Sequence, residues 1–247
     1  MDLNDFFVNN PKVALAFSGG VDSAYLLYAA LKSKAQVTPY YIRSDFQPQF
    51  EYEDALRLCR DLNVEMKVIK LDSLADPIVA ANPSDRCYYC KKHVFGSIME
   101  EAYKDGYEVL IDGTNASDRE DDRPGFKALK ELEVRSPLRE CGLTKAEIRR
   151  LSKEAGLFTW DKPAYACLAT RIKTGETITK EKLVNTERSE GFLMSLGFRD
   201  LRVRQADGKA RLELREEDRE LFEKNKELIM ETLGKYYSYV DPEPGVR

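Results

Sequence analysis

The chain has 247 residues, of which 43% are hydrophobic and 33% charged, and its formal net charge is −4 at pH 7. This composition is typical of a globular protein with a sizeable core, and the acidic balance gives no general attraction to nucleic acid. No apolar run approaches the roughly 20 residues that cross a bilayer, and the polar start MDLNDFF does not resemble a secretory signal. We therefore expect a cytoplasmic protein whose five cysteines stay reduced rather than form a disulfide framework.

The first 160 residues alternate between predicted strands and helices. Short apolar runs predict strands at 12–18, 36–44, 65–72, 107–115 and 133–138. Apolar residues at helical spacing predict helices at 22–32 and 48–63, a long helix that includes 85–95, and a helix at 144–156. The last has a capping box of Thr144 and Glu147 and a stop at Gly156. The alternation predicts an α/β domain over 1–160, with a doubly wound parallel sheet covered by helices on both faces.

After about residue 175 the pattern changes. A helix is predicted at 177–198, strands at 200–205 and 209–215 around an Asp-Gly turn, a helix at 216–234 and a strand at 235–241. This order indicates a smaller α+β domain over 175–247 with a mostly antiparallel sheet.

The stretch FSGGVDS, from Phe17 to Ser23, lies between the first predicted strand and the first predicted helix. Gly19 and Gly20 allow a tight turn and close approach of the backbone to a bulky anion. Ser18 and Ser23 add hydroxyl donors, and the helix that starts after them directs its free N–H groups to the same place. The stretch lacks the Gly-Lys-Ser/Thr ending of a Walker A loop and does not fit G-x-G-x-x-G. It predicts a phosphate-binding loop, with a plain glycine turn as the alternative.

SGGVDS resembles the loop of the PP-loop ATP pyrophosphatases, and DGTNASD (112–118) and TKAEIRRL (144–151) support the resemblance. It implies binding of ATP and Mg²⁺ by an enzyme that adenylates an oxygen or a carboxylate and releases pyrophosphate. Asp22 is then the residue expected to help hold the magnesium, although it could equally serve as a carboxylate that caps the helix. The resemblance assigns the nucleotide to Ser18, Gly19, Gly20, Val21, Asp22, Ser23, Ser44, Gly113 and Asn115.

AYACLATRI (164–172), TGETIT, GFLMSLGFRDLRVR and DREDDRPGFKAL (118–129) resemble the LarE branch of that superfamily. The resemblance implies sulfur transfer to a pyridinium dicarboxylate mononucleotide during assembly of the nickel-pincer cofactor of lactate racemase. It places Cys167 where the family has its sulfur-delivering cysteine and assigns substrate binding to Arg171, Arg202 and Arg204. A solvated strand face with surface ion pairs is the alternative for Arg202 and Arg204. By analogy we expect a homo-oligomer.

The stretch DRCYYCKKHVF (85–95) adds Cys87 and Cys90 to Cys167. Three thiolates can hold three irons of a 4Fe–4S cluster, and the resemblance extends to LarE proteins that use such a cluster to deliver sulfide. Other LarE proteins sacrifice the sulfur of a single cysteine at the Cys167 position. Zinc held by the three cysteines and His93, or a redox pair, are further alternatives. Cys59 is expected in the core, and Cys141 has no evident partner.

Two other kinds of protein fit parts of this pattern. A PP-loop tRNA thiolase would use the same activation but needs a nucleic-acid surface, which the acidic balance does not favour. A nucleotide-sensing protein without catalysis would not need the three cysteines. The partners we expect are therefore a small nucleotide substrate and a source of sulfide, with neither a membrane nor nucleic acid.

Overall fold

The computed structural model describes residues 2–118 and 124–246, which form two compact units. The N-terminal unit comprises Met1–Ser73 and Asp85–Lys162, and the C-terminal unit comprises Leu74–Ser84 and Pro163–Arg247. Within the described residues, no helix is both long and apolar enough to cross a membrane.

A parallel four-stranded sheet forms the centre of the N-terminal unit. Its strands are β1 (Lys12–Ala16), β2 (Gln36–Arg43), β3 (Lys67–Lys70) and β4 (Leu110–Ile111), in the order β3-β2-β1-β4. The predicted parallel α/β sheet is therefore confirmed, with strands shorter at their ends than the apolar runs suggested.

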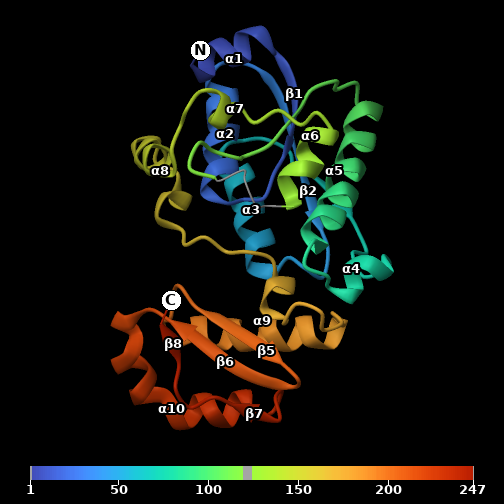
Figure 1. Cartoon of the computed structure of the whole chain (residues 1–247). Helices are drawn as coiled ribbons and strands as arrows, with labels where there is room; N and C mark the ends of the chain where they lie inside the picture. The colour runs from blue at the N-terminus through green and yellow to red at the C-terminus, as the bar shows by residue number, and fades with distance from the viewer. Residues whose placement is uncertain (1, 119–123, 247) are drawn as a thin grey trace. The chain divides into compact units, whose positions relative to one another are not determined.

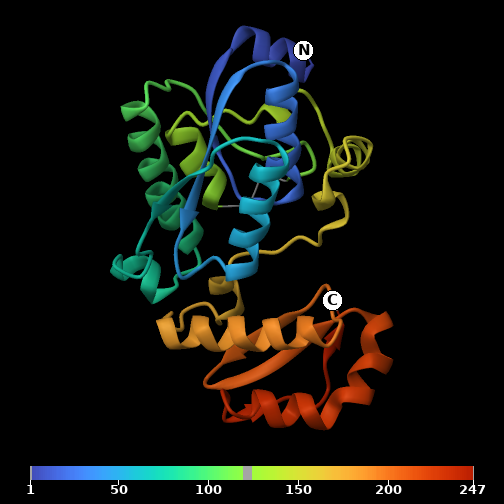
Figure 2. The same ribbon diagram turned by 180° about the vertical axis from the view of Figure 1, so that it is seen from behind.

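Helices cover both faces of this sheet because its side chains alternate. Val13 and Leu15 pack on one side with α1 (Leu3–Asn9), α2 (Val21–Lys32), α3 (Gln49–Asp61) and α8 (Lys145–Glu154). Ala14 points to the other side, where α5 (Arg86–Lys104) and α6 (Pro124–Glu131) pack. Figure 1 shows the sheet between α2 and α3 on one side and α5 on the other, and Figure 2 shows the same layers from behind.

Two helix ends follow the sequence signals closely. The Thr144 side chain accepts from the backbone N–H of Glu147, and the Glu147 carboxylate accepts from the backbone N–H of Thr144, so the predicted capping box is confirmed. Beyond the end of α8, Gly156 has φ +70°, which a residue with a side chain rarely adopts.

The predicted fifth strand at 133–138 is wrong. A single parallel bridge pairs Ile111 with Arg135, through hydrogen bonds that join Arg135 to Leu110 and Asp112. The segment cannot extend further because Pro137 has no N–H to donate and instead begins the short helix α7 (Pro137–Glu140).

The strand order creates a switch point beside β1. The chain passes from β1 to β2 and β3 on one side and then returns to β4 on the other side of β1. In such sheets the carboxyl ends of the two strands at the switch point border a ligand crevice. Here these ends continue into the 17–20 loop, which leads into α2, and the 112–118 loop.

The C-terminal unit packs α9 (Lys180–Ser195) and α10 (Arg219–Leu233) on the apolar face of a second sheet. Its strands β5 (Arg202–Ala206) and β6 (Lys209–Leu214) are antiparallel around a turn in which Asp207 and Gly208 both have positive φ. The remaining strands, β7 (Tyr239–Val240) and β8 (Gly245–Val246), both pair with β6 in the parallel sense. The sheet is thus mixed rather than mostly antiparallel, because α10 carries the chain back before β7 and so makes a β-helix-β crossover.

Residues 74–84, including α4 (Pro77–Ala81), belong to the C-terminal unit although they lie far from it in sequence. Asn82 has left-handed backbone geometry, with φ 57°, and its side-chain amide donates to the carbonyls of Lys173 (2.9 Å) and Glu176 (3.2 Å). The backbone N–H of Gly175 donates to the Asn82 carbonyl at 2.8 Å. One buried asparagine therefore ties this segment to the start of the C-terminal unit.

Candidate active site

The loop between β1 and α2 is shaped by its own two serines. The hydroxyls of Ser18 and Ser23 lie 3.0 Å apart, and the backbone N–H groups of Ser18 and Gly20 donate to these hydroxyls at 3.3 and 3.4 Å. Gly20 is the N-cap of α2 and supplies no side-chain hydrogen bond to the first turn of the helix. Because a helix leaves its first N–H groups without partners inside the helix, the start of α2 can donate to an anion.

Two glycines keep the backbone of this region accessible. Gly19 has φ +72°, and a Cβ there would lie 3.0 Å from the Cβ of Ala55 on α3. A Cβ on Gly113 would lie 2.9 Å from the backbone nitrogen of Ser23. The loop after β4 therefore passes directly against the first turn of α2, and any side chain at 113 would collide with that turn.

Asp22 in the first turn of α2 has two polar partners from other elements. Its Oδ1 accepts from the Asn115 side chain at 3.3 Å, and its Oδ2 accepts from Lys145 Nζ at 2.5 Å. Burial raises the pKa of Asp22, and the hydrogen bond to Lys145 opposes that rise only in part. The structure thus gives Asp22 a cationic partner, Lys145, that the sequence did not predict, although Lys145 lies in the stretch TKAEIRRL (144–151).

Asn115 is fixed by its own loop. It is 3% exposed, its side-chain oxygen accepts from the Ser117 N–H at 2.9 Å, and its backbone N–H donates to Asp118 at 3.1 Å. Asp112 accepts from Thr114 and from Ser136, which fixes the start of the same loop. The loop after β4 therefore presents Gly113 and Asn115 to the start of α2 in a defined geometry.

Ser44 lies just past the carboxyl end of β2, as expected for a residue near the crevice. Its hydroxyl donates to the Gln47 side chain at 2.7 Å and accepts from the Phe46 N–H at 3.2 Å. These contacts order the local turn, and the nucleotide role of Ser44 stays a prediction.

Cys87 and Cys90 lie three apart near the start of α5, so they share one side of the helix. Cys87 is exposed and Cys90 partly buried, and the guanidinium of the buried Arg86 lies 3.8 Å from the Cys87 sulfur. His93 is exposed one turn further along the same helix. Within either unit, no group of three or more described His, Cys, Asp or Glu residues is placed to hold a metal ion.

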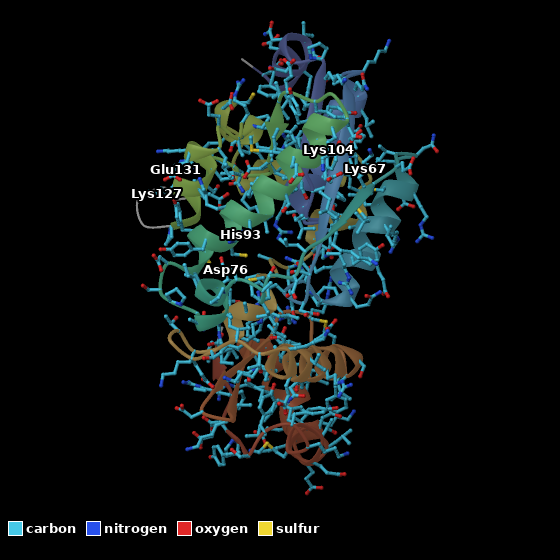
Figure 3. The ribbon with its side chains drawn as sticks, turned by 90° about the vertical axis from the view of Figure 1, so that its right-hand side faces the viewer. Lys67, Asp76, His93, Lys104, Lys127 and Glu131 are labelled. Atoms are coloured by element: carbon cyan, nitrogen blue, oxygen red, sulfur yellow. The ribbon has the colours of Figure 1, made fainter. Side chains whose placement is uncertain are left out.

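The cysteine-bearing turn of α5 is held by α6. Glu131 of α6 accepts from the Tyr88 hydroxyl at 2.8 Å and from Lys92 at 3.0 Å, and Lys127 lies over the Tyr88 ring. Figure 3 labels Glu131 and Lys127 on α6 beside α5, together with His93. Tyr88, which lies between the two cysteines, is therefore an anchor that the sequence alone did not reveal.

The other two N-terminal cysteines are packed against the core of their unit. Cys59 is 3% exposed, and burial raises the pKa of its thiol to about 12. The predicted core position of Cys59 is confirmed. Cys141 is partly buried at the end of α7, where burial likewise raises its pKa.

Cys167 lies in the C-terminal unit at the N-cap of the 3-10 helix η2 (Leu168–Arg171) and is partly buried. Its carbonyl accepts from the Thr170 hydroxyl at 2.8 Å and from Arg171 at 3.3 Å. The backbone that carries the thiol is thus held from its carbonyl side.

The three arginines assigned to the substrate have unequal surroundings. Arg171 is 1% exposed and pairs with Glu190 of α9. Arg202 is 4% exposed and donates to the Ala164 carbonyl at 2.5 Å. Arg204 is only half-buried and donates to the Thr170 carbonyl at 2.6 Å. Arg204 also lines a pocket of about 520 Å³ together with Lys173, Lys209 and Arg211.

Comparison with known proteins places these features in a family. The family of the queuosine biosynthesis protein QueC matches residues 12–86. An uncharacterized protein of Synechocystis is 38% identical over 216 residues, which span 86% of this chain and 80% of that protein. The pyridinium-3,5-bisthiocarboxylic acid mononucleotide synthase of Lactiplantibacillus plantarum, a LarE protein, is 34% identical over 83% of this chain and 75% of its own length. The chain belongs to the LarE family.

More distant similarity connects this LarE-family chain to a second group of sulfur enzymes. The tRNA-specific 2-thiouridylase MnmA of a Thermotoga species is 26% identical over 191 residues, which span 59% of this chain and 52% of that protein. The PP-loop fold and the LarE branch, both expected from the sequence, are confirmed. In the family-like stretch 118–129, residues 119–123 lie outside the described part of the chain, and a substrate role for that stretch stays a prediction.

Proposed function

We propose that this protein is an ATP-dependent sulfur transferase that converts a carboxylate of a pyridinium dicarboxylate mononucleotide to a thiocarboxylate, as a step of nickel-pincer nucleotide cofactor biosynthesis. The observation that carries the proposal is the arrangement of Asp22, Asn115 and Lys145 around the open start of α2, in a chain of the LarE family. We place the reaction in the cytoplasm and expect the protein to act as a homo-oligomer with an external sulfide source.

Activation of the carboxylate would use the residues at the switch point. The first N–H groups of α2 and the Ser18 and Ser23 hydroxyls would bind ATP phosphates, and Lys145 would add a positive charge. A substrate carboxylate oxygen attacks the α-phosphorus of ATP, and the bond to the bridging oxygen breaks, so that pyrophosphate leaves and an acyl adenylate forms. The residues act mainly by positioning and by charge neutralisation, because there is little covalent chemistry for a protein to do in such a transfer.

The donor set around Asp22 fits a magnesium ion that accompanies the triphosphate. A carboxylate beside a phosphate site is a preferred Mg²⁺ ligand, and within residues 2–118 and 124–246 the Oδ2 atom of Asp22 accepts a hydrogen bond from Lys145. A bound triphosphate would compete for Lys145 and so free that oxygen for the metal. Asp22 would then hold the ion, while Asn115 keeps its carboxylate oriented.

Substrate recognition would fall to the arginines of the C-terminal unit. Arg204 reaches a pocket lined by Lys173, Lys209 and Arg211 and by the carboxylates Asp207 and Asp241. Arg204 pairs with Glu213 and Lys173 with Asp207, so a phosphate or carboxylate of the substrate would compete with these carboxylates for the two cations. Arg202 shares its side of β5. The donors of Arg171 are directed into the protein, and so are those that Arg202 gives to the Leu201 and Ala164 carbonyls.

For the sulfur source we propose a 4Fe–4S cluster held by Cys87, Cys90 and Cys167. The thiols fit this role in type and exposure, since Cys87 is exposed and Cys90 and Cys167 are partly buried. Such a cluster, when bound, would supply sulfide. Sulfur bonds to the acyl carbon, AMP departs, and the thiocarboxylate results. The alternative is sacrifice of the sulfur of Cys167 itself.

Anaerobic purification followed by iron and sulfide analysis tests the source of sulfur. We expect iron and sulfide in the wild-type chain, loss of both in Cys87→Ser, and retention in the matched variant Cys141→Ser. The same samples are then assayed for repeated turnover of the pyridinium dicarboxylate mononucleotide. A chain without iron, which makes one thiocarboxylate and loses one sulfur mass at Cys167, would establish the sacrificial route instead.

The similarity to MnmA makes tRNA thiolation the second candidate. The two candidate functions are distinguished by supplying unmodified tRNA or the mononucleotide, each with ATP, to the same protein preparation. Pyrophosphate release that depends on the mononucleotide supports the proposal, whereas thiolated tRNA would overturn it.

A further inference from the structure

A buried ion pair holds the segment that carries Cys167. Arg171 at the end of η2 and Glu190 of α9 are each 1% exposed. They form a two-pronged contact, in which Arg171 Nε lies 2.9 Å from Glu190 Oε1 and Arg171 Nη2 lies 3.0 Å from Glu190 Oε2. This geometry fixes the plane of the guanidinium relative to α9.

The remaining guanidinium nitrogen of Arg171 is directed at the backbone beside Cys167. Nη1 donates to the Ala166 carbonyl at 2.7 Å, to the Thr170 hydroxyl at 2.9 Å and to the Cys167 carbonyl at 3.3 Å. The arginine thus contacts the residue before the thiol, the thiol-bearing residue itself and the helix that follows.

Glu190 connects the same pair to the sheet. Its Oε1 also accepts from the backbone N–H of Val203 on β5 at 2.8 Å, and its Oε2 accepts from the Tyr165 hydroxyl. The Tyr165 ring in turn lies 4.3 Å from the Arg171 guanidinium carbon. One carboxylate therefore joins α9, β5 and the segment 165–171.

A need for stability does not by itself account for this arrangement. A buried ion pair stabilises a fold no better than well-packed apolar side chains of the same volume, because both charges lose their water. A 3-10 helix of four residues also has poor intrinsic geometry and cannot fix the residue at its N-cap unaided. Thr170 holds the Cys167 carbonyl through its hydroxyl (2.8 Å) and its backbone N–H (3.0 Å). The Arg171 side chain adds contacts to the Ala166 and Cys167 carbonyls and ties this turn to α9 through Glu190.

We propose that Arg171 and Glu190 are positioning residues that set the backbone of Cys167 so that its thiol reaches the activated carboxylate. The inference rests on the proposed function, in which Cys167 delivers sulfur or holds the cluster that does so. It also revises the expected role of Arg171, which acts on Cys167 from inside the fold rather than on the substrate.

The test separates the two half-reactions in the full-length chain. Glu190→Gln keeps the size of the side chain and an acceptor for Val203, but it removes the charge and the second acceptor for Arg171. Arg171→Lys keeps the charge but cannot contact Glu190 and the Ala166 carbonyl together. Thr186→Val is the matched control, because it removes a buried bond between α9 and Gln205 of β5 that does not touch 165–171.

A single-turnover burst of pyrophosphate reports adenylation, and the thiocarboxylate is measured by mass spectrometry. Both test variants should keep the pyrophosphate burst within about twofold and lose thiocarboxylate formation by at least about tenfold, since a displacement of about 1 Å is sufficient for such a loss. Thr186→Val should keep both. Equal losses of both reactions in all three variants, or unchanged thiocarboxylate formation in Glu190→Gln, would overturn the inference.

Alkylation provides a readout that does not depend on turnover. Iodoacetamide labelling of Cys167, mapped by mass spectrometry and normalised to Cys141 in the same sample, should be faster by several fold in Arg171→Lys, because the released backbone uncovers a partly buried thiol. An unchanged ratio counts against positioning. Cys167→Ser separates this question from the proposed function. If it makes thiocarboxylate normally, the role of Cys167 fails, whereas if it is inactive while Glu190→Gln is normal, only the positioning role fails.

Discussion

The phosphate loop at Ser18–Ser23 and the buried Arg171 use their hydrogen-bond donors in opposite ways. Around Ser18–Ser23, the start of α2 has no side-chain cap, and the charged pair of Asp22 and Lys145 remains partly exposed. Around Arg171, the guanidinium donates to a carboxylate, two carbonyls and a hydroxyl, with almost none of it exposed. The start of α2 keeps N–H donors that a ligand can use, whereas the donors of Arg171 all bond to acceptors within the protein. A charged residue near a candidate site is therefore informative only when its existing partners are known.

The largest effect should follow from removing the Glu190 carboxylate, which pairs with Arg171. Glu190→Ala leaves a buried guanidinium without its counter-charge, so we expect the free energy of unfolding of the C-terminal unit to fall by about 3–5 kcal/mol. Far-ultraviolet circular dichroism reports both units, whereas fluorescence of the single tryptophan, Trp160, reports the N-terminal unit. The exposed Glu154, paired with Arg150, provides the matched control Glu154→Ala. A thermal transition equal to that of the control would contradict the comparison.

Removing the cation of the phosphate loop should affect activity instead of stability. Lys145→Ala should lower the rate of pyrophosphate release about 100-fold, as for the loss of one charge-stabilising donor. The free energy of unfolding should change by no more than about 1 kcal/mol, because the pair with Asp22 is partly exposed. Arg150→Ala on the same helix serves as control. If stability fell as much as in Glu190→Ala, the loop would be a structural element rather than a ligand site.

A methyl group at Gly113 tests whether the open start of α2 is used. Gly113→Ala brings a Cβ to 2.9 Å from the Ser23 nitrogen, and we expect the KM for ATP to rise at least about tenfold because loop and helix must separate. In Gly96→Ala the new methyl meets no heavy atom within 4 Å, and that variant should bind ATP normally. Isothermal titration with a non-hydrolysable ATP analogue gives the comparison directly, and equal affinities would argue that the nucleotide binds elsewhere.

The smallest effect concerns Asp22 and depends on pH. Burial raises its pKa above the ordinary value of 3.8, so the ionised carboxylate is less favourable in the folded chain than in the unfolded one. The preference of the folded chain for the protonated Asp22 side chain adds to the free energy of unfolding. This addition is fully present below pH 3.8 and is lost as the pH rises through the raised pKa of the folded chain. Asp22→Asn should therefore have a slightly higher Tm than the wild type at pH 7, with the difference vanishing near pH 3.8. A lower Tm at pH 7 would show that the contact with Lys145 outweighs burial.

Sequence reasoning recovered what local pattern encodes. The apolar runs that form the single strands, the glycine loop at Gly19–Gly20, the cap at Thr144 and the Asp-Gly hairpin all depend on residues close together in the chain. The pairing of Asp22 with Lys145 spans 123 positions, and no spacing rule predicts it. The predicted fifth strand failed because Pro137 interrupts an otherwise strand-like run.

The arginines show the same limit at the level of function. A pattern such as RVR on a strand gives the side of the sheet but not the partners, so it could not distinguish the half-buried Arg204 from the enclosed Arg202. Burial and contact across the fold made that distinction.

The position of residues 74–84 has a consequence for synthesis. Asn82 bonds to carbonyls that lie 90 to 94 positions later in the chain. At a translation rate of about 5–20 residues per second, this segment is synthesised roughly 5 to 20 seconds before its partners. The N-terminal unit therefore has to begin folding while residues 74–84, which interrupt it, still lack the C-terminal residues against which they pack.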